Sequence, residues 1–282
     1  MTRSPKWALA AGAAALTLAL SACSGGTATP GATGSPGAPA GTIKIGIKYD
    51  QPGLGLQEGN TFTGFDVEVA KYVAGELGYA EDSIEFVEAK SPQRETMIQG
   101  EQVELIFATY SITDARKEKV SFAGPYFIAG QDLLVRTDDT SITGPDTLTG
   151  KKLCSVAGST PAQNVKKDHP DVDLVEYDTY SKCVSALESG GVDALTTDNV
   201  ILAGYAAQPQ YAGKFRVVGQ PFSTERYGVG MTKGDVETCT KVNDALKKMV
   251  DSGAWKEALD KTVGASGFQP DDRNPPATEP CS

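Results

Sequence analysis

The sequence predicts an α/β protein, because segments of strand length and segments of helix length alternate along most of the chain. Short apolar runs are separated by longer segments whose apolar residues recur every three or four positions. This alternating part spans about 240 residues, enough for one large domain or two modest ones. Repeated strand–helix–strand units imply largely parallel sheets with helices on both faces.

The first half of the alternating part begins with a strand and a long amphipathic helix, in which an apolar residue returns at every fourth position of one face. The expected strands are Ile43–Ile47, Ile84–Val87 and Val103–Ala108, and the expected helices are Phe65–Leu77 and Arg94–Gln99. After Pro125, the segment Ala129–Val135 is expected to be extended and to cross from one part of the fold to another.

The second half repeats the alternation and ends in two helices. The expected strands are Lys152–Val156, Asp173–Tyr177, Ala194–Thr197, Phe215–Gly219 and Tyr227–Met231, and the expected helices are one from about Pro161, Ser181–Glu188, Val236–Val250 and Ala254–Lys261. Gln220–Glu225 is a plausible return crossing. Alternation alone does not separate one doubly wound domain from two smaller ones.

The N-terminus has the features of a secretory signal. Arg3 and Lys6 precede the apolar run Trp7–Leu20, which is too short to span a bilayer. The run leads to Leu-Ser-Ala-Cys, which has the form of a lipobox. We therefore expect residues 1–22 to be removed and Cys23 to be lipidated, with an ordinary signal peptide and an incidental cysteine as the alternative.

The composition after Cys23 favours the lipid anchor. Ser24–Gly41 contains no charged residue and consists almost entirely of Gly, Ala, Pro, Ser and Thr. Such a segment cannot bury a core, and it would act as a flexible tether. Residues 23–41 would thus hold a folded domain just outside a membrane, and no other segment is long and apolar enough to cross one.

The net charge argues against nucleic acid as a partner. The chain has 26 basic and 36 acidic residues, a formal charge of −10. Loss of Arg3 and Lys6 with the signal leaves 24 basic residues against 36 acidic ones. So negative a protein would repel polyanions, and an anionic substrate would need a local concentration of cations.

The cysteine count fits an exported protein. Five cysteines are present, and four remain once Cys23 is assigned to the lipid. Four cysteines allow three connectivities, and pairing within each region of the chain is the simplest: Cys154 with Cys183 and Cys239 with Cys281. A metal site is weakly supported, because no CxxC occurs and His169 is the single histidine.

A candidate anion site lies around Arg116. Thr113 has the form of a helix N-cap, so Arg116 would fall in a first turn, where a cation is mildly unfavourable unless an anion compensates for it. The hydroxyl groups of Thr109 and Ser111 lie just upstream and would complete a carboxylate cradle. The alternative is a surface arginine on an exposed helix.

These residues belong to motifs that resemble a known family. The pattern T-x-S-I-T-x-x-R-x-x-x-V-x-F-x-x-P-Y is similar to the signature of the polar amino-acid solute-binding proteins, the extracytoplasmic receptors of ABC importers. GFDVEVAKYVAGELG, LTGKKLCSVAGST and LESGGVDALTTD extend the resemblance over nearly all of Thr42–Phe268. SPQRETMIQG and the paired cysteines resemble the glutamate-binding lipoproteins of that family.

The resemblance implies a two-lobed, type II periplasmic-binding-protein-like fold whose lobes close by hinge rotation. Residues 42–130 and 222–282 would form lobe 1, and residues 131–221 would form lobe 2. The crossovers would lie near Ala129–Val135 and Gln220–Thr224.

The resemblance also implies a ligand set for an amino acid. Arg116, with Ser111, Thr109 and Thr160, would hold the α-carboxylate. Asp198 would take the α-ammonium, although capping of a helix at Asn199–Tyr205 is an alternative role. Arg94, which follows Ser91, and Lys48, at the end of the first strand, would jointly neutralise a side-chain carboxylate. The eight expected ligand-binding residues are Lys48, Ser91, Arg94, Thr109, Ser111, Arg116, Thr160 and Asp198.

We therefore expect a monomeric, lipid-anchored receptor on the outer face of the cell membrane, without cofactor or metal. It would bind L-glutamate, with aspartate harder to exclude, and deliver it to an ABC permease and its ATPase subunits. The alternatives are a receptor for glutamine or another polar amino acid, a ligand-sensing surface protein, and a dehydratase-like enzyme on the same scaffold. No Ser/His/Asp set and no nucleotide-binding loop supports an enzyme.

Overall fold

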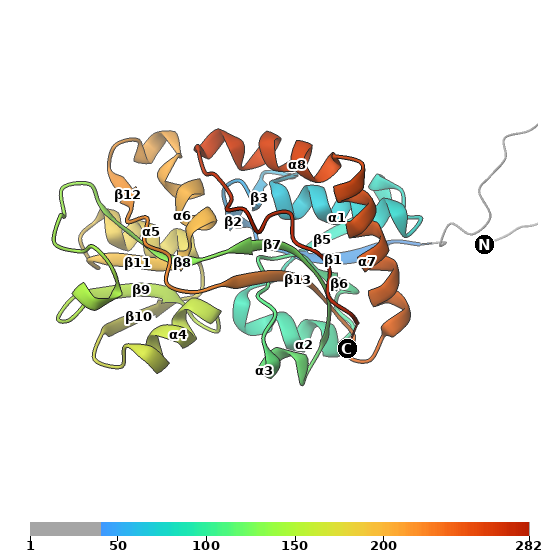
Figure 1. Cartoon of the computed structure of the whole chain (residues 1–282), viewed down its shortest axis with the longest axis horizontal. Helices are drawn as coiled ribbons and strands as arrows, with labels where there is room; N and C mark the ends of the chain where they lie inside the picture. Colours follow the sequence, from blue (N-terminus) through green and yellow to red (C-terminus); the bar gives the residue numbers. More distant parts are fainter. Residues whose placement is uncertain (1–40, 282) are drawn as a thin grey trace, which may run out of the picture. The chain divides into compact units, whose positions relative to one another are not determined.

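The computed structural model describes residues 41–281, in which two five-stranded sheets organise the chain (Figure 1). The strand orders are β5-β1-β6-β13-β7 in the first sheet and β10-β9-β11-β8-β12 in the second. In each sheet one strand, β13 or β8, runs antiparallel to both of its neighbours, and the other paired strands run in a common direction. The predicted, largely parallel α/β organisation is thus confirmed for the described residues.

The first sheet combines segments from both ends of the described chain. Its strands are β1 (Ile43–Ile47), β5 (Ile84–Glu88), β6 (Leu105–Ile106), β7 (Ser121–Ala129) and β13 (Glu225–Met231). The helices around it are α1 (Phe65–Glu76), α2 (Arg94–Gln99), α3 (Asp114–Lys117), α7 (Val236–Asp251) and α8 (Ala254–Thr262). α1 buries Phe65, Val69 and Val73 on the face that the sequence periodicity predicts.

The second sheet is built from one continuous stretch. Its strands are β8 (Gln131–Arg136), β9 (Lys152–Val156), β10 (Asp173–Tyr177), β11 (Ala194–Asp198) and β12 (Phe215–Val217), and its helices are α4 (Thr160–Asp168), α5 (Tyr180–Glu188) and α6 (Asn199–Ala206). The expected Cys154–Cys183 disulfide joins β9 to α5. It lies within the core of this sheet, where both cysteines are fully buried.

The chain passes between the sheets twice. β7 ends at Ala129 and β8 begins at Gln131, so the outward passage is made at Gly130. The return runs from the end of β12 to the start of β13 at Glu225. β8 and β13 start at these passages, so they are antiparallel to the strands that end there. The parallel strands of both sheets consequently direct their carboxyl ends toward the passages.

The C-terminal segment is fastened to the strands that make the passages. The Glu279 N–H donates to the Gly124 carbonyl at 2.6 Å. The Asn274 side chain exchanges two hydrogen bonds with the backbone of Ile128, at 2.9 and 2.8 Å. The expected Cys239–Cys281 disulfide ties the end of the segment to α7.

The secondary structure differs from the sequence prediction in several places, of which two lie in the first half of the described chain. A small antiparallel sheet of β2 (Asp50–Gln51), β3 (Gly55–Glu58) and β4 (Thr61–Thr63) follows β1 and was not expected. Conversely, β6 has two residues where a strand over Val103–Ala108 was predicted. These strands are too short for a pattern of alternating hydrophobicity to develop.

The predicted signal peptide (residues 1–22), Cys23 and nearly all of the tether lie outside the described residues. Over residues 41–281 we find no helix with the length and apolar character needed to cross a membrane. The predicted lobe boundaries at 130/131 and 221/222 remain a prediction.

Candidate functional site

A small cavity lies where the carboxyl ends of strands from both sheets meet. The empty space between its lining residues, open solvent included, is about 230 Å³. Residues from both sheets line it: Ser91, Arg94, Thr109, Ser111, Arg116, Ser159, Thr160, Pro161, Tyr180, Asp198 and Ile201. All of these except Thr160 are buried. Seven of the eight expected ligand-binding residues are therefore brought together, and Lys48 is not among the lining residues.

Arg116 spans the cavity from one sheet to the other. Its Nη1 donates to the Ser111 carbonyl at 2.8 Å and to Thr160 Oγ1 at 2.9 Å, and its Nη2 donates to the Gly158 carbonyl at 3.1 Å. The predicted cap is present, because Thr113 Oγ1 accepts from the Arg116 N–H at 3.3 Å. However, α3 is a single turn, too short to supply the helix N-terminal anion site that the sequence suggested.

Arg94 lies at the start of α2 and is 3% exposed. Its Nε donates to the Ala89 carbonyl at 3.5 Å, and within residues 41–281 it forms no ion pair with a carboxylate. Burial, reinforced by the nearby charge of Arg116, lowers the pKa of this guanidinium. An unpaired cation at such a depth is costly, so this part of the cavity favours an anion.

The Tyr110 ring lies close to both arginines. The guanidinium carbons of Arg94 and Arg116 each lie 5.0 Å from the ring centroid, a distance at which the face of an aromatic ring attracts cations. Glu95, which follows Arg94 on α2, lies 3.5 Å from Arg116 Nε and partly balances its charge. Arg94 is left as the cation with the poorer compensation.

Asp198 ends β11 and supplies the negative charge of the cavity. Tyr227 donates a hydrogen bond to its Oδ2 at 2.5 Å. Its Oδ1 is buried and has no hydrogen-bond partner among the described residues. Asp198 precedes α6 but its side chain makes no capping hydrogen bond, so the capping role considered for it is not what the structure shows. Burial, then the nearby Glu225, raises the pKa of Asp198 well above its usual value.

Thr109 has an unusual backbone at the floor of the cavity. Its φ of 47° lies in the left-handed region, which is rare for a β-branched residue. The Thr109 N–H donates to Asp66 Oδ2 at 2.9 Å, and Tyr126 donates to Asp66 Oδ1 at 2.7 Å. Asp66 is completely buried, and burial raises the pKa of its carboxyl to about 6.

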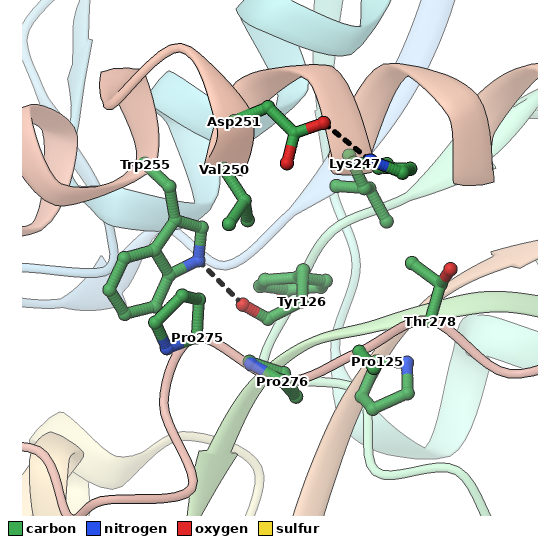
Figure 2. A pocket seen from close by; sticks show the side chains of 11 residues that line it. Pro125, Tyr126, Lys247, Val250, Asp251, Trp255, Pro275, Pro276 and Thr278 are labelled. Carbon is green, nitrogen blue, oxygen red and sulfur yellow. Dashed lines mark hydrogen bonds and ion pairs between the residues drawn. The ribbon is translucent and has the colours of Figure 1, made fainter.

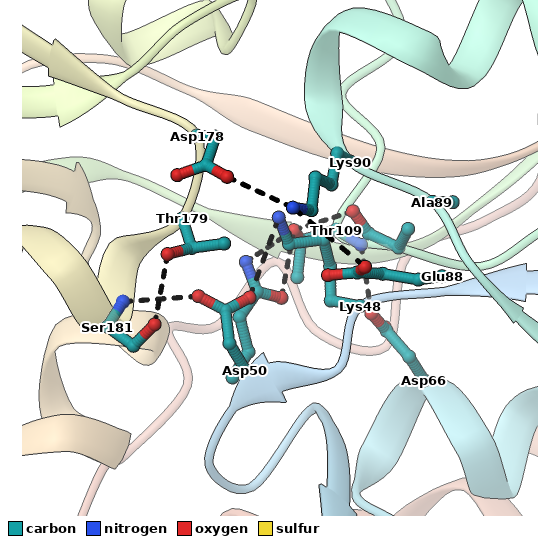
Figure 3. A network of polar contacts seen from close by, with 12 residues as sticks. Lys48, Asp50, Asp66, Glu88, Ala89, Lys90, Thr109, Asp178, Thr179 and Ser181 are labelled. Carbon is teal, nitrogen blue, oxygen red and sulfur yellow. Dashed lines mark hydrogen bonds and ion pairs between the residues drawn. The ribbon is translucent and has the colours of Figure 1, made fainter.

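Lys48 lies beside the cavity and not in its wall. It is 1% exposed, and its Nζ lies 3.6 Å from Asp50 Oδ1 and 5.9 Å from the centre of the Tyr180 ring. Burial lowers the pKa of Lys48. The expected direct pairing of Lys48 and Arg94 around one carboxylate is therefore not seen, because Lys48 is directed to Asp50 (Figure 3).

Contacts between the two sheet units surround this lysine. Figure 3 shows Lys90 directed toward Asp178, with 3.0 Å between Nζ and Oδ2. The backbone N–H of Ser181, on α5, donates to Asp50 Oδ2 at 3.1 Å. Elements of the first sheet thus hold elements of the second sheet next to the cavity.

Several lining and supporting residues were not predicted from the sequence: Glu95, Tyr180, Ile201, Glu225 and Tyr227. Glu95 could have been suspected, because it adjoins Arg94 on a helix that begins near the site. Glu225 and Tyr227 gave no signal, since only the return of β13 to the first sheet brings them close to Asp198.

A second depression lies between α7, α8 and the C-terminal segment (Figure 2). The empty space within it, open solvent included, is about 880 Å³. Its surface is largely apolar, made by Tyr126, Val250, Trp255, Pro275 and Pro276. Trp255 Nε1 donates to the Tyr126 carbonyl at 2.8 Å. It lacks the buried opposite charges of the first cavity, which remains the candidate site for a charged ligand.

The fold and the first cavity together define a class of protein, in which two α/β units enclose a small solute between their strand ends. Residues 43–265 match the bacterial extracellular solute-binding proteins, family 3, and the chain belongs to this family. The predicted two-lobed, type II fold and the expectation of a binding protein instead of an enzyme are thereby confirmed.

Individual relatives bear names that concern amino acids. The chain is 50% identical over 235 residues to glutamate-binding protein GluB of Corynebacterium glutamicum, covering 79% of each protein. It is 35% identical over 223 residues to the ABC transporter glutamine-binding protein GlnH of Bacillus subtilis, covering 78% of this chain and 81% of the relative. A solved structure of an ancestral arginine-binding protein bound to glutamine is 34% identical and has a TM-score of 0.74, covering 79% of this chain and 98% of that one.

Proposed function

We propose that this protein binds L-glutamate in the cavity between its two sheet units and delivers it to an ABC permease. The observation that carries the proposal is the charge inventory of the cavity wall. It contains two buried guanidinium groups, Arg94 and Arg116, and one buried carboxylate, Asp198. A zwitterion with one additional carboxylate complements this set, whereas a neutral amide would leave Arg94 without an anion.

Each end of the ligand has a matching group. The α-carboxylate pairs with Arg116, with the hydroxyls of Ser111 and Thr160 beside it, and Thr109 forms the floor. The α-ammonium donates to the free Oδ1 of Asp198. The side-chain carboxylate pairs with Arg94 next to Ser91. Lys48 contributes positive potential from behind the wall, without direct contact.

The remaining parts of the proposal concern location and delivery. Cys23 carries the lipid, residues 24–41 tether the protein to the outer face of the membrane, and the monomer closes by rotation of lobe 1 (residues 42–130 and 222–282) against lobe 2 (residues 131–221). The relatives support glutamate as the ligand, since the glutamate-binding ones are more identical to the chain than the glutamine-binding ones. Radiolabelled palmitate should be incorporated by the wild type and not by Cys23→Ser.

Calorimetry of the mature chain carrying Cys23→Ser tests the ligand. Glutamate should bind at least about tenfold more tightly than glutamine, a difference of about 1.4 kcal/mol. Aspartate, titrated in parallel, reports whether the cavity distinguishes ligands whose side chains differ by one methylene group. Equal affinities for glutamate and glutamine would refute the acidic ligand.

A further inference from the structure

Two buried acids flank the passage between the sheets. Asp198 pairs with Gln131 at the start of β8, and Glu225 pairs with Ala129 at the end of β7. Only Gly130 separates these two partners. Both acids are 2% exposed, so neither charge has access to bulk water.

The hydrogen-bond partners of the two acids are neutral. Asp198 accepts from Tyr227, and Glu225 Oε1 accepts from Ser223 at 2.8 Å and from Asn164 at 3.3 Å. No lysine or arginine among residues 41–281 forms an ion pair with either acid at 4.0 Å or less. The charged groups that act on Asp198 from the surrounding elements are Glu225, Arg94 and Arg116, together with the ionisable phenols of Tyr180 and Tyr227.

Two negative charges at this depth without a close cation repel each other strongly. The free Oδ1 of Asp198 is also the one carboxylate oxygen of the cavity wall that lacks a partner among the described residues. We propose that Asp198 carries a proton in the ligand-free protein, that Glu225 keeps it there, and that the ligand's ammonium displaces it to solvent. The raised pKa of Asp198, caused by burial and then by Glu225, agrees with this.

The displacement needs no further reactant. The O–H bond of Asp198 breaks, the proton passes to the buffer, and the ammonium group keeps its three protons and donates one hydrogen bond to Oδ1. Glu225 stays outside the cavity wall and acts through Asp198, which makes it a positioning residue. The inference rests on the proposed function, because it requires a ligand that carries an ammonium group.

Two other ionisable side chains of the described residues are Asp66 and His169. Asp66 faces Arg94 from α1, and the pKa of its carboxyl is about 6. A ligand carboxylate placed near Arg94 would raise this pKa further, so Asp66 would take up protons and oppose the proposed signal. His169 packs against Phe222, with 6.4 Å between ring centres, and does not line the cavity.

Proton release is measured by titrating glutamate calorimetrically in buffers of different ionisation enthalpy, at about pH 6, 7 and 8. The wild type should release protons on binding glutamate and bind it more tightly as the pH rises. At about pH 6 the net release should stay below one proton, because Asp66 takes up protons there. Glu225→Gln keeps an oxygen for Ser223 and Asn164 but removes the charge, so it should release markedly fewer protons at the same pH. The exposed Glu237→Gln should behave as the wild type.

Tyr227→Phe provides a second variant if Glu225→Gln does not fold. It removes the donor that favours ionised Asp198, so proton release should extend to higher pH, opposite to the effect at Glu225. Tight glutamate binding without proton release would overturn this inference and leave the proposed function intact. Equal proton release by the wild type and Glu225→Gln would overturn the role of Glu225. Absence of glutamate binding would overturn both.

Discussion

Thr109 illustrates how single residues are held in place at the site. Its left-handed backbone would relax if the N–H were free, and the buried Asp66 carboxylate accepts from that N–H and prevents it. Asp66 lies in the first turn of α1, where the helix macrodipole also favours a negative charge. Asp66 is therefore a structural support of the cavity floor.

The two arginines should have separable effects. Arg94→Ala should weaken glutamate binding by about 1.5–3 kcal/mol, the range for hydrogen bonds to charged groups, and should change glutamine binding much less. Arg116→Ala should remove binding of both ligands, because both carry an α-carboxylate. Competition between glutamate and glutamine for each variant measures the ratio of the two affinities. An Arg94→Ala variant with unaltered glutamate affinity would mean that this residue does not contact the ligand.

The Asp66 carboxyl should make stability depend on pH. Its pKa is raised in the folded protein to about 6, so the folded state holds the proton more tightly than the unfolded chain. The free energy of unfolding contributed by Asp66 is therefore highest below about pH 4 and falls by about 3 kcal/mol as the pH rises through about 6. Denaturant unfolding of the wild type and of Asp66→Asn across this range measures the free energy of unfolding of each. As the pH rises, the wild type should lose stability relative to the variant. A difference in the free energy of unfolding that does not change with pH would contradict the raised pKa of Asp66.

The position of Arg116 at a helix start pointed to an anion site, and the resemblance to the solute-binding family pointed to Arg94 and Asp198. Arg94, Arg116 and Asp198 all line the cavity as expected. The sequence prediction did not anticipate that Asp50, two residues after Lys48, would attract that lysine away from the cavity. Nor could it place Tyr227, since a hydrogen bond across 29 residues of sequence depends on the path of the return strand.

Several elements were predicted with their observed bounds, and others were missed in part or entirely. β1, β9, β10 and α2 have the predicted bounds. The hairpin of β2 to β4 was missed because its strands have two to four residues. The start of β7 was missed because Pro125 interrupts the apolar run, and the structure accommodates it in a strand that pairs with β13.

The disulfide between β9 and α5 should stabilise the part of the protein that contains the second sheet. It closes a loop with a sequence separation of 29, so its removal should cost about 3–4 kcal/mol, mainly by freeing the unfolded chain. Cys154→Ala/Cys183→Ala should unfold at correspondingly lower denaturant concentration and still bind glutamate when folded. Unchanged stability would show that the bridge constrains the unfolded chain less than its loop length implies.

At the scale of the whole described chain, the two sheet units meet through close backbone contacts as well as through charged groups. A Cβ added to Gly204 on α6 would lie 2.2 Å from the carbonyl oxygen of Pro52, in the turn between β2 and β3. This carbonyl belongs to the first unit and α6 to the second. Gly204 therefore sets how near the two units can come.

Gly204→Ala should weaken glutamate binding at least about tenfold by holding the units apart, while changing the unfolding midpoint little, because alanine is the better helix former. Gly75→Ala is the matched control, since Gly75 lies in α1 with no atom within 4 Å of an added Cβ. Calorimetry and thermal unfolding of both variants distinguish the outcomes. A Gly204→Ala variant with wild-type affinity would show that the backbone at Pro52 can move away from the added methyl group without weakening glutamate binding.

The burial of almost every residue in the cavity wall has a kinetic consequence. A solute held by side chains from both sheets would leave more readily once the contacts of Arg116 with Thr160 and of Lys90 with Asp178 are broken. The dissociation rate of the solute then cannot exceed the rate at which the two units separate. Ligands of different affinity should therefore share the same upper limit on their dissociation rates. Under the proposed function, the permease would have to accelerate the separation of the two units and would not need to compete for the solute.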